Sequence, residues 1–278
     1  MLDLVTPAAA PVPVQQPPPQ RPVRFRARGF VVKRHPAASL VTFAVLLVLW
    51  EGAVRSGLVS ELFLPAPSSV ATALWDLIED GTLWQNLRAS LFRLGVGWVL
   101  GTVVGIAAGF VIGLSSISRA GGIPVISAIY PIPKIALLPL FILWLGIGET
   151  SKVTVVALGV FFPTCIATFG AIDNVPRGII RMAQSFDVPP LAILRKVVLP
   201  AALPGILSAF RITASVALLL LVAAEMIGAQ FGIGAYVLSQ GQLMQTDDLL
   251  AGVCVISVMG LLIGGGLSWL EKRLLTWR

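Results

Sequence analysis

The stretch NVPRGIIRMAQSFDVPPLAILRKVVLPAALPGILSAFR, residues 174–211, decides the fold. It is the longest region after the N-terminal tail that cannot lie inside a lipid bilayer, because charged side chains interrupt it while apolar runs flank it on both sides. The charged residues that decide this are Arg177, Arg181, Asp187, Arg195 and Lys196. We therefore expect the stretch to lie in water or against another protein.

Local signals divide this stretch into two short helices. The first is expected from Gly178 to Phe186 and stops at Asp187–Pro190. The prolines suit the first turn of a second helix, and Asp187 or its neighbour can cap that turn. Apolar residues then recur at helical spacing up to Val198, and Leu199-Pro200 is expected to end the element. The pattern predicts a helix–break–helix hairpin on a membrane surface, with one apolar and one basic face.

The composition is that of a membrane protein. Hydrophobic residues make up 56% of the chain and charged residues only 12%, whereas soluble domains carry about 25% charged residues. The net charge of +7 does not indicate a nucleic-acid partner, because the basic residues gather at the ends of apolar runs. Cys165 and Cys254 lie inside apolar runs and are interpreted as packing residues. We expect no metal site and no cofactor.

The apolar runs predict an all-α membrane protein with six transmembrane helices, since each run is near the roughly 20 residues that span a bilayer. The runs are residues 38–54, 91–114, 121–146, 153–172, 206–227 and 249–270. Residues 1–37 are rich in proline and arginine and are expected to form a disordered cytoplasmic tail. Residues 38–278 then form the membrane domain, and residues 64–86 are expected to form an interfacial helix on the outside.

The distribution of basic residues predicts the orientation. Most of the twenty lysines and arginines fall in the tail, at Arg119, in the central stretch and at the C-terminal end. The positive-inside rule places these segments in the cytoplasm. Both termini are therefore expected to be cytoplasmic.

Two of the runs have internal features. Glycines recur every four residues in the second run, and such residues let helices approach closely in lipid; packing within one subunit is favoured over a subunit interface. These glycines are Gly97, Gly101, Gly105, Gly109 and Gly113. The third run contains four prolines, which are expected to break its helix and to leave backbone groups facing protein or a water-lined cavity.

Lys134 follows Pro133 in this broken run, about twelve residues and roughly 18 Å of helix rise from its inner end. A charge at that depth costs at least about 2.5 kcal/mol. Two alternatives stay open. In the favoured one, Lys134 snorkels to the cytoplasmic surface; in the other, Pro133 and Lys134 line a pathway and offer a positive charge to an anion. Glu225, near the outer end of the fifth run, is a further pathway candidate.

The central stretch resembles the cytoplasmic loop of permease subunits from ATP-binding-cassette (ABC) importers. The family pattern is Glu-Ala-Ala, three residues, Gly, nine residues, Ile, one residue, Leu-Pro. In this chain the pattern falls on Arg181-Met182-Ala183, Asp187, Val197 and Leu199-Pro200. Ala183, Leu199 and Pro200 match it, whereas Arg181, Met182 and Asp187 depart from it.

Three other segments resemble the branch of this family that transports sulfonates, taurine, nitrate and bicarbonate. They are LWQNLRASLFR (83–93), IPKIALLPLFILWLGIGETSK (132–152) and LLTWR (274–278). Related permeases usually carry Pro-x-Pro-Pro where this chain has Lys134, so the lysine is not part of the resemblance.

The resemblance implies a type I importer permease in a bacterial inner membrane. Two copies would pair, two ABC ATPase subunits would bind, and a periplasmic or extracellular solute-binding protein would deliver a small solute. An anion is favoured, with sulfonates and taurine ahead of nitrate. The loop 174–205 would couple to the ATPase; its contact residues would be Arg181, Gln184, Ser185 and Asp187, with Ala183, Leu199 and Pro200 completing the motif.

The chain is not expected to be an enzyme itself. GIGETSK (146–152) lacks the Gly-four-Gly-Lys-Ser/Thr spacing of a phosphate loop, and the one histidine, His35, lies in the tail. The alternative class is a secondary transporter or channel that does not use ATP. That class expects buried acidic residues for ion coupling, and Glu225 is the one candidate. A non-transporting scaffold does not explain the prolines of the third run.

Overall fold

The computed structural model describes residues 36–275, in two units that we treat separately. Most of the expected tail and the end of LLTWR lie outside these residues. The first unit, up to Leu46, holds the first half of α1 (Pro36–Arg55) and exposes its apolar side chains. The second unit begins at Leu47 and carries the other elements, all helical. These are α2 (Pro67–Glu79), α3 (Thr82–Leu114), α4 (Ser116–Ile129), the 3-10 helix η1 (Lys134–Leu137), α5 (Leu138–Leu145), α6 (Glu149–Asp173), α7 (Arg177–Ser185), α8 (Pro190–Ile193), the π-helical η2 (Leu194–Val198), α9 (Leu199–Gly228), α10 (Ile233–Gln242) and α11 (Thr246–Leu274).

Five helical segments in the described residues are long and apolar enough to cross a membrane. They are α1, α3, α6, the continuous segment Pro190–Gly228 and α11. A sixth crossing exists if α4 and the η1–α5 segment count as one, although the two are bent by 84°. The all-helical fold is confirmed, as is the break in the third run, where Pro131 and Pro133 lie between the two helices.

The glycine stripe of α3 lies against α6. A Cβ at Gly97 would be 2.8 Å from Cβ of Val156, and a Cβ at Gly105 would be 2.8 Å from the carbonyl oxygen of Phe161. Gly101, Gly109 and Gly113 likewise face residues of α6. Only glycine permits this separation of the two backbones. The stripe is therefore used within one chain, as the sequence favoured.

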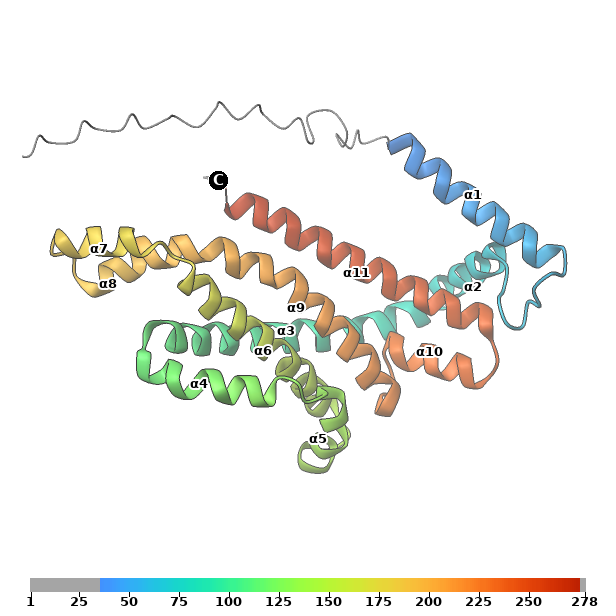
Figure 1. Cartoon of the computed structure of the whole chain (residues 1–278). Coiled ribbons are helices and arrows are strands. Elements are labelled where there is room, and N and C mark those ends of the chain that lie inside the picture. Colours follow the sequence, from blue (N-terminus) through green and yellow to red (C-terminus); the bar gives the residue numbers. More distant parts are fainter. Residues whose placement is uncertain (1–35, 276–278) are drawn as a thin grey trace, which may run out of the picture. The chain divides into compact units, whose positions relative to one another are not determined.

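The core lies where α3, α6 and α9 meet, and Figure 1 shows these three helices alongside one another. Val155, Val156 and Val160 of α6 are fully buried against Leu221 and Ala224 of α9. Apolar side chains of α3, of the η1–α5 segment and of α11 complete this cluster. In the core, α6 is thus packed between α3 and α9.

Two ends of the second unit carry different structures (Figure 1). At one end, α7 and α8 connect the end of α6 to the start of α9; we name it the loop end. At the other, α10 lies between the end of α9 and the start of α11, and α2 packs against α11 there; we name it the α10 end. Charged side chains lie at both ends.

Two boundaries and one element differ from the sequence predictions. α3 begins at Thr82 rather than at residue 91, and α10 was not predicted. The expected end of a helix at Leu199-Pro200 is wrong, because the chain continues through η2 into α9. Pro200 lacks an N–H and its ring would clash with the carbonyl four residues earlier in an α-helix; the wider π turn before it removes that conflict.

Gly101→Ala is expected to loosen the contact between α3 and α6. The new Cβ would collide with the carbonyl oxygen of Ala157 and lie 2.8 Å from Cβ of Val160. Such overpacking costs about 1–3 kcal/mol, so the thermal unfolding midpoint of the purified protein should fall.

Gly95→Ala in the same helix is the matched control, because a Cβ at Gly95 meets nothing within 4 Å. Alanine is a better helix former than glycine, so this variant should keep or raise the midpoint. Equal midpoints for the two variants would contradict the close contact.

Candidate functional site

The turn after α7 is a Schellman motif centred on Asp187. The Val188 N–H donates to the carbonyl of Ala183 (3.2 Å) and the Asp187 N–H donates to that of Gln184 (3.0 Å), which is the paired pattern of this helix ending. Asp187 has φ +53°, in the left-handed region where glycine is usual. Aspartate tolerates that region better than most residues, so the turn survives at the position where the family pattern has glycine.

One face of the loop is anchored to the helices behind it. Ala183 and Val188, which belong to the turn, pack on a buried cluster formed by Ile193, Val198 and the end of α6. Ile172 and Val175 contribute from that side. Ala183 is thus an anchoring residue rather than part of the exposed face.

The opposite face of the loop is open. Arg181, Gln184, Ser185 and Asp187 are all exposed, together with Leu199 and Pro200 at the base of α9. Large apolar side chains are exposed beside them, and we name these four the apolar face of the loop. They are Ile179 (44% exposed), Met182 (57%), Phe186 (76%) and Leu191 (57%). The loop therefore presents apolar groups and charges side by side on one exposed face.

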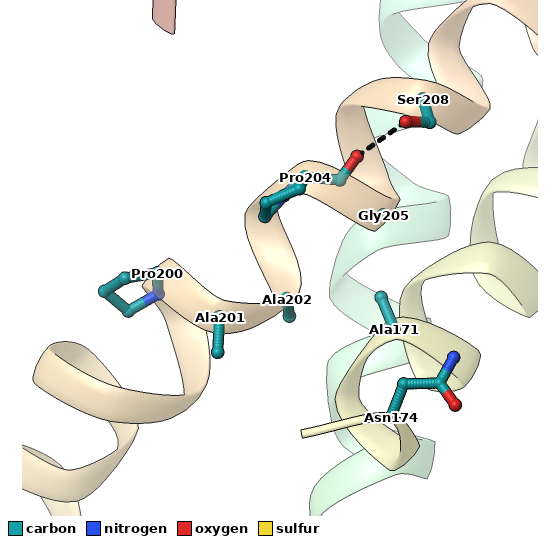
Figure 2. A pocket seen from close by; sticks show the side chains of 8 residues that line it. All are labelled: Ala171, Asn174, Pro200, Ala201, Ala202, Pro204, Gly205 and Ser208. Carbon is teal, nitrogen blue, oxygen red and sulfur yellow. Dashed lines mark hydrogen bonds between the residues drawn. The ribbon is translucent and has the colours of Figure 1, made fainter. Parts of the chain in front are cut away.

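A cavity of about 540 Å³ separates the start of α9 from the end of α6 at the loop end. Figure 2 shows the residues that line it, with Ala171 of α6 and its C-cap Asn174 opposite Ala201, Ala202 and Gly205 of α9. Pro200 and Pro204 lack N–H donors, so the helix has fewer internal hydrogen bonds here; the Ser208 hydroxyl bonds the carbonyl of Pro204 at 2.8 Å. The junction of loop and span is therefore loosely packed.

Lys134 folds back onto the end of α4. Its ammonium donates to the carbonyls of Ile129 (3.2 Å) and Tyr130 and lies 4.7 Å from the ring centre of Phe162 and 5.1 Å from that of Tyr130. The residue is only 9% exposed. The side chain therefore does not extend to a surface as favoured, because the carbonyls at a helix C-terminus and two aromatic faces attract the cation locally. Pro133, directly before it, is the N-cap of η1.

Glu225 is the most buried carboxylate described in the structure, with a fully buried side chain at the α10 end. Its oxygens accept from the hydroxyl of Ser90 (2.8 and 2.9 Å), the N–H of Gly234 (2.9 Å) and the guanidinium of Arg93 (2.8 Å). A buried carboxylate requires such partners. The prediction that Glu225 lies near the end of a span is confirmed, since it lies near the end of α9. Its hydrogen-bond partners were not predicted.

The first amides of α10 are each bonded by a side chain from another helix. Asn86 accepts from the N–H of Gly232 (2.8 Å), Ser90 from that of Ile233 (2.9 Å) and Glu225 from that of Gly234. A Cβ at Gly232 would lie 2.5 Å from Oε1 of Glu225, and its φ is +137°. The glycine is therefore required, and α10 is fixed to α3 and α9 by this network.

Arg93 joins three parts of the α10 end. One edge of its guanidinium contacts Glu225 and the carbonyl of Phe231 (2.6 Å), and the other edge binds Glu149, the first residue of α6, at 2.5 and 2.7 Å. Nearby, the Lys152 ammonium donates to the carbonyls of Ile147 (2.7 Å) and Gly148 (3.1 Å). The roles of Arg93, Glu149 and Ser90 were not predicted from the sequence. The available signal was an arginine two residues inside the predicted second span.

The sequence pattern of a family described as binding-protein-dependent transport system inner membrane components matches residues 101–276. The taurine transport system permease protein TauC of Escherichia coli K12 is 39% identical over 251 residues, which cover 88% of this chain and 91% of TauC. The putative aliphatic sulfonates transport permease protein SsuC of Bacillus subtilis 168 is 35% identical, covering 84% of this chain and 85% of SsuC.

Solved structures with the same fold include an inward-facing MetNI methionine ABC transporter, with a TM-score of 0.60 and 21% identity, covering 69% of this chain and 96% of that one. An amino acid ABC transporter has a TM-score of 0.53 and 20% identity, covering 72% and 98%. These two likenesses concern the fold alone.

Asp187→Val is expected to destabilise the loop, because a β-branched residue is strongly disfavoured in the left-handed region and the penalty there is about 1–2 kcal/mol. Amide hydrogen exchange across residues 177–190 should accelerate by roughly fivefold to thirtyfold. Asp187→Gly is the control and should leave the exchange unchanged or slower. Equal exchange in both variants would show that the turn geometry is not what holds the loop.

Proposed function

The chain belongs to the family of binding-protein-dependent transport system inner membrane components, and from this premise we propose that it moves a small sulfonate, such as taurine or an alkanesulfonate, into the cell. It is a membrane-spanning permease of the ABC importer class, with the ATPase on a separate polypeptide. The substrate assignment rests on one observation: the chain is 39% identical to a taurine permease and 35% identical to a sulfonate permease over most of each chain. Neither relative is described as a nitrate permease, so nitrate is left out.

The proposed assembly has two copies of this chain, two ATPase subunits and one solute-binding protein. The loop end would face the cytoplasm, as the basic residues predict, and the α10 end would face the binding protein. The family membership removes the alternative of a transporter that works without ATP. The buried acid on which that alternative depended is also held by Arg93, Ser90 and the N–H of Gly234.

The apolar face of the loop is the proposed docking surface for the ATPase. Phe186, the most exposed of its side chains, lies next to the Asp187 turn. Arg181, which is also exposed, lies on α7, the helix that Phe186 ends. Because Arg181 replaces the glutamate of the family pattern, the ATPase group that meets it should be acidic or absent.

Movement of the loop is proposed to reach the spans through the start of α9. The helix is continuous from Pro190 to Gly228, so a push on the loop is transmitted along α9. The cavity between α9 and α6 leaves room for that shift (Figure 2). Lys134 lacks comparable support as a pathway residue, because its ammonium already donates to the carbonyls of Ile129 and Tyr130 at the end of α4.

Phe186→Ala is expected to weaken ATPase binding. Burying a phenylalanine side chain contributes about 1.5–3 kcal/mol, and each 1.4 kcal/mol is about tenfold in Kd, so affinity should fall by roughly tenfold to a hundredfold. Leu243→Ala, which removes an exposed apolar group (63% exposed, against 76% for Phe186) at the α10 end, should leave it unchanged. Unchanged affinity in the Phe186 variant would contradict the docking surface.

The mass of the purified assembly should correspond to two permeases and two ATPases. The substrate is then tested with this assembly reconstituted in lipid vesicles. Binding protein loaded with taurine or an alkanesulfonate is expected to stimulate ATP hydrolysis and uptake. No stimulation by any sulfonate, with stimulation by another class of solute, would overturn the proposed substrate and leave the family membership intact.

A further inference from the structure

Arg93 lies between two carboxylates of very different exposure. The side chain of Glu225 is 0% exposed and that of Arg93 is 3% exposed, whereas the side chain of Glu149 is 53% exposed. Glu225 has two other donors, Ser90 and Gly234. The half-exposed carboxylate of Glu149 can therefore leave Arg93 for water. The carboxylate of Glu225 cannot, because it would remain a buried charge that has lost its ion-pair partner.

The contact between Arg93 and Glu149 has the geometry of oxyanion recognition. Nε and one terminal nitrogen of the guanidinium each donate to a different oxygen of the carboxylate, at 2.5 and 2.7 Å. This two-point fork suits carboxylates and tetrahedral oxyanions alike. A sulfonate offers two adjacent oxygens to the same pair of N–H groups.

The charges around this fork also favour an anion. With Glu149 in place, Arg93 and Lys152 are balanced by Glu149 and Glu225. When Glu149 leaves, the two cations face Glu225 alone, and the cluster has one net positive charge. The N-terminus of the 25-residue α6 lies at the same place and adds its partial positive charge.

We propose that the Glu149-binding edge of Arg93 is a transient binding site for the sulfonate group of the solute, and that Glu149 is a built-in competitor that occupies it between transport cycles. The proposal rests on the proposed function, because it assumes an anionic solute arriving at the α10 end. Arriving sulfonate would displace the exposed carboxylate, while the Glu225 contact keeps the guanidinium in position. When the sulfonate leaves, Glu149 returns.

The decisive variant is Glu149→Gln, because competition and a purely structural ion pair predict opposite results. The probe is ethanesulfonate, titrated against the complex of permease and ATPase in lipid nanodiscs without binding protein, and the readout is the concentration that gives half-maximal thermal stabilisation. Removal of the competing charge should lower that concentration at least fivefold. Ethanesulfonamide, which is uncharged, should stabilise neither form. A structural pair instead predicts a less stable complex with the same or weaker response to ethanesulfonate.

One further variant separates the two-point contact from the charge, and two others are controls. Arg93→Lys keeps a cation beside Glu225 but loses the two-point contact, so the half-maximal concentration should rise at least tenfold. Arg88→Lys and Glu79→Gln, which change exposed residues of the same charge types on α3 and α2, should match the wild type.

An unchanged or higher half-maximal concentration in Glu149→Gln overturns the inference. If the wild-type assembly is still stimulated by sulfonate-loaded binding protein in that case, the proposed function stands and only this site is wrong. If the wild type responds to no sulfonate at all, the proposed substrate and this inference fall together.

Discussion

The close approach of α3 and α6 is the interaction on which the rest of the structure depends. In a bilayer there is little hydrophobic driving force between helices, so packing at short distance and polar contacts must hold them together. The glycines from Gly97 to Gly113 permit that distance and set the register of the two helices. One turn before Gly97, the same register brings Arg93 to Glu149 at the start of α6. The charged network at the α10 end is thus a continuation of the glycine contact.

The two ends use their polar groups in different ways. At the α10 end, side chains of α3 and α9 satisfy the first amides of α10, and the Tyr236 hydroxyl donates to Asp248 of α11 at 3.2 Å. Burial, together with that nearby carboxylate, raises the pKa of Tyr236. At the loop end, apolar groups stay exposed and the junction with the spans contains a cavity. One end is fixed by internal hydrogen bonds, whereas the other leaves apolar surface exposed.

The features that local sequence patterns encode could be predicted. The helices, the proline break and the loop follow from apolar run length and from residues next to one another, and the left-handed turn at Asp187 follows from the family pattern. The network of Arg93, Glu149 and Glu225 was missed because its partners lie 56 and 132 positions apart. α10 was missed because it is only ten residues long and its first amides are bonded by acceptors far away in the sequence, on α3 and α9.

The length of α3 sets where the membrane boundary crosses the chain. Its 33 residues rise about 50 Å, while the hydrocarbon layer is about 30 Å thick. If the hydrocarbon layer begins at Leu114, it ends near Arg93, and the first turns of α3 lie beyond it. The guanidinium and its carboxylates then lie at the level of the lipid headgroups, where inserting a charge costs far less than at the bilayer centre. In a thicker bilayer these charged groups would lie inside the hydrocarbon layer. The thickness of the bilayer would then affect the stability of the charged network.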